Sequence, residues 1–206
     1  MKDRQQWIWL LLFGSVWGIG EVAIGGALYK ANVAYASVWL SAWALCVLAL
    51  ARGLLNKPGS STFIGGVATL FKLVNASPFL CHLLGIFALG LAFDVAASLL
   101  LKDERGVSYR SSLAGLLSAY AGYALFAFTI TYVVRYHWWT AEGLPKVLRH
   151  IFVSGTFAAA AGLVLVPLGY WVGLQAETLA LRRPRWVYGS ALVASVVFWG
   201  LAQVAG

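Results

Sequence analysis

Long apolar stretches that each carry one ionisable residue deep inside constrain this chain more than any other feature. Glu21 lies within Trp7–Tyr29, Lys72 within Ser61–Ala76, and Asp94 within Pro78–Leu101. A charge at membrane depth is costly, so such a residue normally faces protein, a partner or a cavity rather than lipid. The pattern therefore predicts an integral membrane protein with a polar interior.

The apolar stretches occupy most of the chain. Of its 206 residues, 61% are hydrophobic and 11% charged, with a mean hydropathy of +0.81, whereas soluble domains are about 25% charged. About 20 apolar residues span a bilayer as a helix. We therefore expect one membrane domain over residues 1–206, an all-α bundle of six to seven spans, because the third candidate is short. The candidates are Trp7–Tyr29, Val33–Ala51, Ser61–Ala76, Pro78–Leu101, Ser111–Val134, Val147–Ala176 and Trp186–Ala205.

The net charge of +8 indicates topology rather than nucleic-acid binding, because the basic residues are unequally divided between the two sides. By the positive-inside rule, the N-terminus is predicted to be cytoplasmic, in a cell inner membrane. The N-terminal side carries Lys2, Arg4, Arg52, Lys57, Lys102, Arg105, Arg110, Arg182, Arg183 and Arg185. The other side carries Lys30, Lys72, Arg135, Lys146 and Arg149.

The sequence lacks the common nucleotide-binding and hydrolase motifs. It contains no phosphate-binding Gly-x-x-x-x-Gly-Lys-Ser/Thr loop, no Gly-x-Ser-x-Gly and no His-Glu-x-x-His, so we predict neither an ATPase nor another enzyme. Cys46 and Cys81 differ in predicted depth by about 20 Å, too far for a disulfide. His82, His137 and His150 show no metal-ligand spacing, so no metal or cofactor is expected, although haem or quinone binding stays an alternative.

The first span carries the most informative helix face. Gly14, Gly18, Glu21 and Gly25 recur at three- and four-residue spacing, so they share one face, and glycines there let another helix approach closely. Glu21 is either a structural carboxylate inside the bundle or a ligand contact.

Lys72 is a candidate partner for Glu21, because both lie a few residues outward of the middle of their spans. The pair is either structural or part of a binding site, and Lys72 alternatively snorkels to the outer surface. Asp94 lies about 10 Å deeper. Tyr120, Tyr123 or a cytoplasmic-side arginine are its candidate partners, and its role is open.

The longest outer loop runs from Arg135 to Pro145 and contains Trp138 and Trp139. These tryptophans are typical of an interfacial aromatic belt. The alternative interpretation is a lid over an outward-facing pocket. Farther along, Pro167 predicts a kink in the sixth span.

Three segments resemble the substrate-binding S-components of energy-coupling factor transporters and related uncharacterised bacterial membrane proteins. They are Phe13-Gly14-Ser15-Val16-Trp17-Gly18-Ile19-Gly20-Glu21, Lys57-Pro58-Gly59-Ser60, and Gly65-Gly66-Val67-Ala68-Thr69-Leu70-Phe71-Lys72. The resemblance implies six helices around an outward pocket, and a first helix that docks a transmembrane coupling subunit. Gly14, Gly18, Ala23 and Ala27 would form that docking face. This chain departs from the family in its seven candidate spans, and the Met-His start of metal-specific members is absent.

These observations lead to two main functional hypotheses. The first is a small-molecule uptake subunit without its own ATPase, which works with a coupling subunit and separate ATPases. Its substrate would meet Glu21, Lys72, Asn75 and His82, with Trp138 and Trp139 above them. The second is a non-catalytic accessory subunit of a larger membrane complex.

Overall fold

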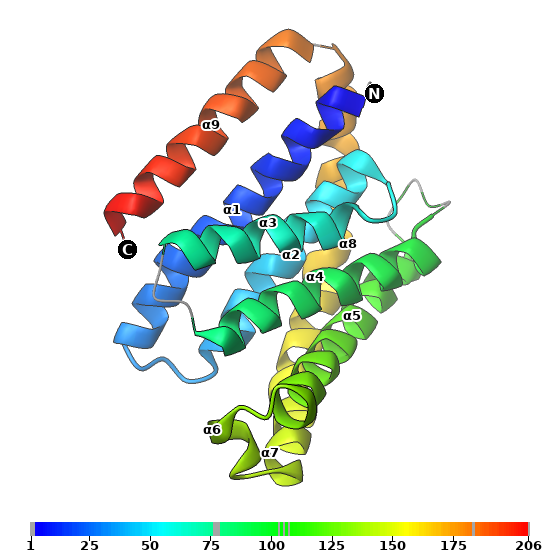
Figure 1. Ribbon diagram of the computed structural model, residues 1–206. Coiled ribbons are helices and arrows are strands. Elements are labelled where there is room, and N and C mark those ends of the chain that lie inside the picture. Colours follow the sequence, from blue (N-terminus) through cyan, green and yellow to red (C-terminus); the bar gives the residue numbers. More distant parts are fainter. Residues whose placement is uncertain are drawn as a thin grey trace.

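The protein is described by a computed structural model that covers residues 3–75, 79–102, 104, 106, 108–182 and 184–205. Side chains are described for residues 6–74, 79–102, 104, 106, 108–177 and 189–201. Within these ranges every regular element is a helix (Figure 1). The long helices are α1 (Asp3–Lys30), α2 (Ala36–Leu55), α3 (Ser60–Asn75), α4 (Leu80–Leu100), α5 (Tyr109–Phe128), α8 (Gly155–Arg182) and α9 (Pro184–Ala205).

Six of these helices form a closed ring. Helix α1 packs on α3, α3 on α4, α4 on α5, α5 on α8, α8 on α2, and α2 returns to α1. Helix α9 lies outside the ring along α1 (Figure 1). The ring therefore consists of the first six predicted spans, and the seventh is an outer addition.

Glycines set the spacing between neighbouring helices of the ring. A methyl group on Gly115 of α5 would collide with the backbone carbonyl oxygen of Gly162 on α8. A methyl group on Gly65 of α3 would lie 3.2 Å from the α-carbon of Gly90 on α4. Lipid gives helices no hydrophobic reason to associate, so close backbone contact has to supply the attraction between them. The glycine-rich composition thus serves helix packing throughout the ring.

Among the described residues, five helical segments are by length and composition able to cross a membrane: Gln6–Lys30, Ala36–Leu55, Leu80–Leu100, Tyr109–Val133 and Leu144–Glu177. The apolar segments of α3 and α9 whose side chains are described, Ser60–Val74 and Gly189–Leu201, are shorter. The predicted all-helical fold is confirmed for the described residues, and the apolar helices fit a membrane protein. The number of spans and the side on which the N-terminus lies stay predictions.

The loop between the fifth and sixth predicted spans is itself largely helical. Here α5 continues as the π-helix η1 (Thr129–Val133), followed by the short helices α6 (His137–Thr140) and α7 (Leu144–Arg149). A second π-helix, η2 (His150–Ser154), then leads into α8, which continues through Pro167. Single π-helical turns frequently occur at functional sites, and both lie at the same end of the bundle.

Candidate functional site

A cavity of about 240 Å³ lies inside the ring and is partly open. Its described lining comes from α1, α2, α4, α5, α6 and η2, and no side chain described for α3 is part of it. The contributing segments are the C-terminal halves of α1 and α5 and the N-terminal parts of α2 and α4. Because neighbouring helices alternate in direction, these segments meet at one end of the bundle, opposite the loop between α2 and α3.

Glu21 is the cavity's charged residue, and Lys72 lies next to it. The Lys72 ammonium donates to the backbone oxygen of Glu21 at 2.9 Å and lies 3.4 Å from its carboxylate Oε2. The Trp17 indole donates to Oε1 at 3.2 Å. Both Glu21 and Lys72 are buried. Glu21 lines the cavity, but Lys72 does not, so the acidic member of the pair is the one in the cavity wall.

Gly25 lies beside this pair. A methyl group there would lie 3.6 Å from the Lys72 ammonium nitrogen, an ordinary van der Waals distance. The glycine face predicted on the first span thus faces the lysine of α3. Gly14 and Gly18 belong to the same contact, because a methyl group on either would collide with Val67 or Phe71 of α3.

The four residues predicted to dock a coupling subunit therefore fall into two groups. Gly14 and Gly18 are engaged inside the chain, against α3. Ala23 and Ala27, on the same helix, are exposed. Only the alanines are free to meet another protein.

The cavity wall is rich in aromatic side chains. They are Trp17, Tyr29, Tyr123, Phe126 and Trp139. The hydroxyl of Tyr123 forms a hydrogen bond of 3.1 Å with Ser41. Both side chains line the cavity, as does Ser37. The wall is thus largely apolar with a few polar groups, which is usual for a small-molecule site.

Two histidines line the cavity. His82 on α4 stacks on Tyr29 at 5.1 Å between ring centres. His150, the first residue of η2, stacks on Tyr123 at 4.7 Å and meets Trp139 edge-on. Sequence reasoning missed the contributions of Tyr29, Tyr123 and His150. Their location toward the outer ends of apolar spans is a signal, but it equally indicates residues at the membrane interface.

The remaining predicted site residues are Trp138, Trp139 and Asn75, and the structure places them differently. Trp139 lies in the cavity wall, but its neighbour Trp138 is 68% exposed. Asn75 ends α3, and its side chain lies outside the described residues. The two tryptophans therefore differ in placement, with one at the cavity and the other on the surface.

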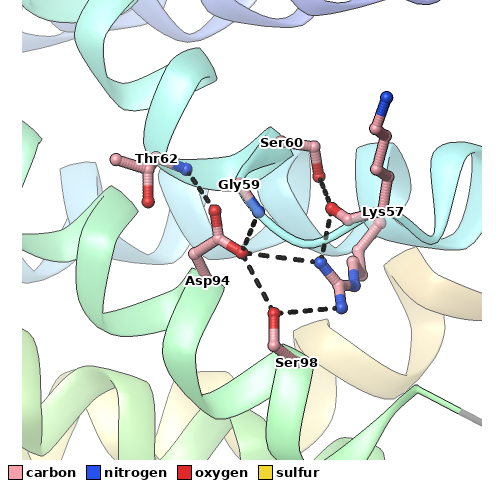
Figure 2. A network of polar contacts seen from close by, with 7 residues as sticks. Lys57, Gly59, Ser60, Thr62, Asp94 and Ser98 are labelled. Carbon is pink, nitrogen blue, oxygen red and sulfur yellow. Dashed lines mark hydrogen bonds and ion pairs between the residues drawn. The ribbon is translucent and has the colours of Figure 1, made fainter.

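Asp94 belongs to a separate network at the opposite end of the ring. Its carboxylate accepts hydrogen bonds from the backbone amides of Gly59 at 2.9 Å and Thr62 at 2.8 Å (Figure 2). It thereby caps the N-terminus of α3, whose first amides have no partner within the helix. Arg52 of α2 lies 3.5 Å from the same carboxylate. Of the candidate partners predicted for Asp94, an arginine, Arg52, is the one that the structure places beside it, rather than Tyr120 or Tyr123.

Arg52 also connects this network to the loop and to α4. It is completely buried and donates to the backbone oxygen of Lys57 at 2.7 Å and to Ser98 at 3.2 Å. Figure 2 shows Ser98 beside Asp94, to which it donates at 3.2 Å. Among the described residues Arg52 Nε has no hydrogen-bond partner, but the other contacts hold the buried arginine and aspartate in place, so we assign the network to stability.

Among the described side chains, no group of three or more His, Cys, Asp or Glu residues is arranged to hold a metal ion. Comparison with known proteins adds no relative: no protein-family model matches the chain, and neither a curated protein nor a solved structure does. The evidence for function therefore comes from the cavity and the residues that surround it.

Proposed function

We propose that this protein is the substrate-binding subunit of a small-molecule uptake system and that the cavity holds the substrate. The observation that carries this proposal is the aromatic cavity with Glu21 in its wall. A largely apolar pocket with a few convergent polar groups is the usual form of a small-ligand site. A carboxylate buried at membrane depth is costly to maintain, which favours a functional use of Glu21.

The proposed orientation places the N-terminus in the cytoplasm of a bacterial cell and the cavity toward the outside. Arg52, Lys57 and Lys102 lie at the end of the ring opposite the cavity. An excess of basic residues favours the cytoplasmic side. A substrate would then enter from the outer face, past α6 and α7.

Uptake requires an energy source, and the chain has no nucleotide-binding motif of its own. The proposed system therefore includes a transmembrane coupling subunit and separate ATPases. Ala23 and Ala27 offer a small-residue face on α1 for the coupling subunit, since both are exposed. Small residues let two membrane helices approach closely.

The test is native mass spectrometry of the protein extracted gently with its partners and ligand. We expect a bound small molecule, which is lost when the cavity is filled by Gly85→Leu. Gly85 lines the cavity, and the nearest atom to an added methyl group is on Phe126, 3.8 Å away. Gly66→Leu is the matched control, because nothing lies within 4 Å of a methyl group there and Gly66 is not in the cavity.

A ligand that persists in Gly85→Leu would show that it binds elsewhere, which would contradict the proposal. A ligand-free protein found within an unrelated membrane complex would instead favour the second function, an accessory subunit. The exposed pair Ala23 and Ala27 fits that function as well. In that case Glu21 and Lys72 would have a structural role only.

A further inference from the structure

The cavity is asymmetric in charge. Its described lining contains one carboxylate, Glu21, and no lysine or arginine. Lys72 approaches that carboxylate from α3, a helix with no described side chain in the wall. The negative end of the pair therefore faces the cavity, while the positive end faces α3. An anionic ligand would meet the carboxylate and, apart from the two histidines, find no basic side chain in the described lining.

The Glu21 carboxylate retains capacity for another partner. Trp17 donates to Oε1 and Lys72 to Oε2, at 3.2 Å and 3.4 Å. These are long for bonds to a charged group, which are typically about 2.7–2.9 Å. An ionised carboxylate has about four acceptor positions. A cation in the cavity would therefore add to these bonds rather than compete with Lys72 for a single oxygen.

The rest of the wall suits a cation that carries carbon groups. Trp17, Tyr29, Tyr123, Phe126 and Trp139 provide aromatic rings from α1, α5 and α6. The faces of such rings attract cations, and rings gathered around a site are the usual binding mode for quaternary ammonium groups. A bare metal ion would instead need several oxygen or nitrogen ligands. No cluster of three such side chains exists among the described residues.

We propose that the ligand is a small organic cation, bound with its charge toward Glu21 and its carbon groups against the aromatic wall. This inference rests on the proposed function, because it names the ligand class of the same cavity. The cavity of about 240 Å³ lies below the range of ~300–1,000 Å³ that is usual for small-molecule sites. The ligand is therefore small, about the size of a single ring or a short alkylammonium compound.

The experiment compares three probes of the same shape and different charge: choline, 3,3-dimethylbutan-1-ol and 3,3-dimethylbutanoate. The purified protein is kept in a maltoside detergent, which carries no ammonium group to compete. Quenching of tryptophan fluorescence reports binding, since Trp17 and Trp139 line the cavity. We expect choline to bind about tenfold more tightly than the neutral alcohol, from its attraction to the rings and the carboxylate. The carboxylate probe should bind least.

Two variants test which residues cause the preference for choline over the neutral alcohol. Glu21→Gln combined with Lys72→Met removes both charges together, so no buried charge is left without a partner. We expect this variant to lose the part of the choline preference that the carboxylate supplies and to keep the part that the rings supply, with the alcohol's own affinity changed less than about twofold. Trp139→Leu, which keeps the ion pair, should weaken choline binding more than alcohol binding. The second variant keeps the test valid if the first does not fold.

The outcomes separate the two proposals. Equal binding of choline and the alcohol, with both lost in Gly85→Leu, would overturn the cation preference but leave the cavity as a binding site. Failure of choline to bind the wild-type protein would also overturn the cation proposal. Choline binding that Gly85→Leu leaves unchanged would place the cation outside the cavity and count against both proposals.

Discussion

Asp94 and Arg52 form a buried ion pair, 3.5 Å apart, that joins α4 to α2 while the same carboxylate caps α3. One side chain thus connects three helices of the ring. Replacing one member of a buried ion pair typically costs about 3–5 kcal/mol, because the other charge is left without its partner.

Asp94→Asn should therefore lower the thermal stability of the detergent-solubilised protein strongly, by about 3–5 kcal/mol in free energy of unfolding. The amide also keeps only one oxygen to accept hydrogen bonds from Gly59 and Thr62. Thermal unfolding followed by circular dichroism gives the measurement. Glu177→Gln is the control, because Glu177 is exposed near the end of α8; equal losses in the two variants would refute the role of Asp94.

A double-mutant cycle on Glu21 and Lys72 should show strong coupling. Lys72→Met leaves the buried Glu21 carboxylate without its cation, which costs about 3–5 kcal/mol, whereas removing both charges is often close to neutral. We expect the double variant with Glu21→Gln to be more stable than Lys72→Met alone. Thermal unfolding of the four proteins measures this, and strictly additive effects would mean that the two residues do not interact.

The glycine contacts predict opposite effects for two similar substitutions. Gly115→Ala should destabilise the protein by about 1–3 kcal/mol, because its methyl group collides with the Gly162 backbone of α8. Gly66→Ala, in open space on α3, should stabilise it by about 0.5–1 kcal/mol through helix propensity. Unfolding in a denaturant series compares the two. A stabilising Gly115→Ala would show that α5 and α8 are less closely packed than described.

The segment of α6 and α7 should respond to acid through Glu142, which lies between these two helices. A hydrogen bond from Lys146, together with the charges of Lys146 and Arg149, lowers the pKa of Glu142 below its ordinary value of 4.5. A carboxyl group with a lowered pKa in the folded state stabilises the fold above its ordinary pKa, and this stabilisation disappears as pH falls through the lowered value.

Lys146 lies over the ring of Trp139, 5.4 Å from its centre, so loss of the Glu142 contact should change the surroundings of that tryptophan. We expect a fluorescence change below pH 4.5 that is absent in Glu142→Gln. Trp139→Phe, which removes the reporting ring, is the matched control. A change of the same size in Glu142→Gln would assign it to another group.

The sequence allowed the fold class to be predicted, because apolar length alone identifies membrane helices. It also allowed Lys72 to be proposed as a partner of Glu21, because the two residues lie at similar predicted depth in their spans. The partner of Asp94 was harder to predict from the sequence. Arg52 lies just after the second predicted span and was assigned to a loop, whereas the structure buries it completely. Two of the other partners are backbone amides, which have no sequence signature.

The cavity wall was harder to predict for a related reason. Tyr123 and His150 come from α5 and η2, and only the order in which helices meet in the ring brings them together. Helix adjacency cannot be derived from apolar length. The placement of Trp138 on the surface and Trp139 in the wall likewise depends on the short helix α6 within a predicted loop.

Helix α3 shows what the two ion pairs accomplish together. The 16 residues described for α3 extend about 24 Å at 1.5 Å per residue, less than the ~30 Å of a bilayer's apolar core. A helix this short would normally thin the surrounding lipid or tilt its neighbours. Here Asp94 of α4 holds its first turn and Glu21 of α1 holds Lys72 near its last. Protein contacts thus hold both the first turn of α3 and the region of Lys72, and we expect the ring to keep this helix in membranes of different thickness.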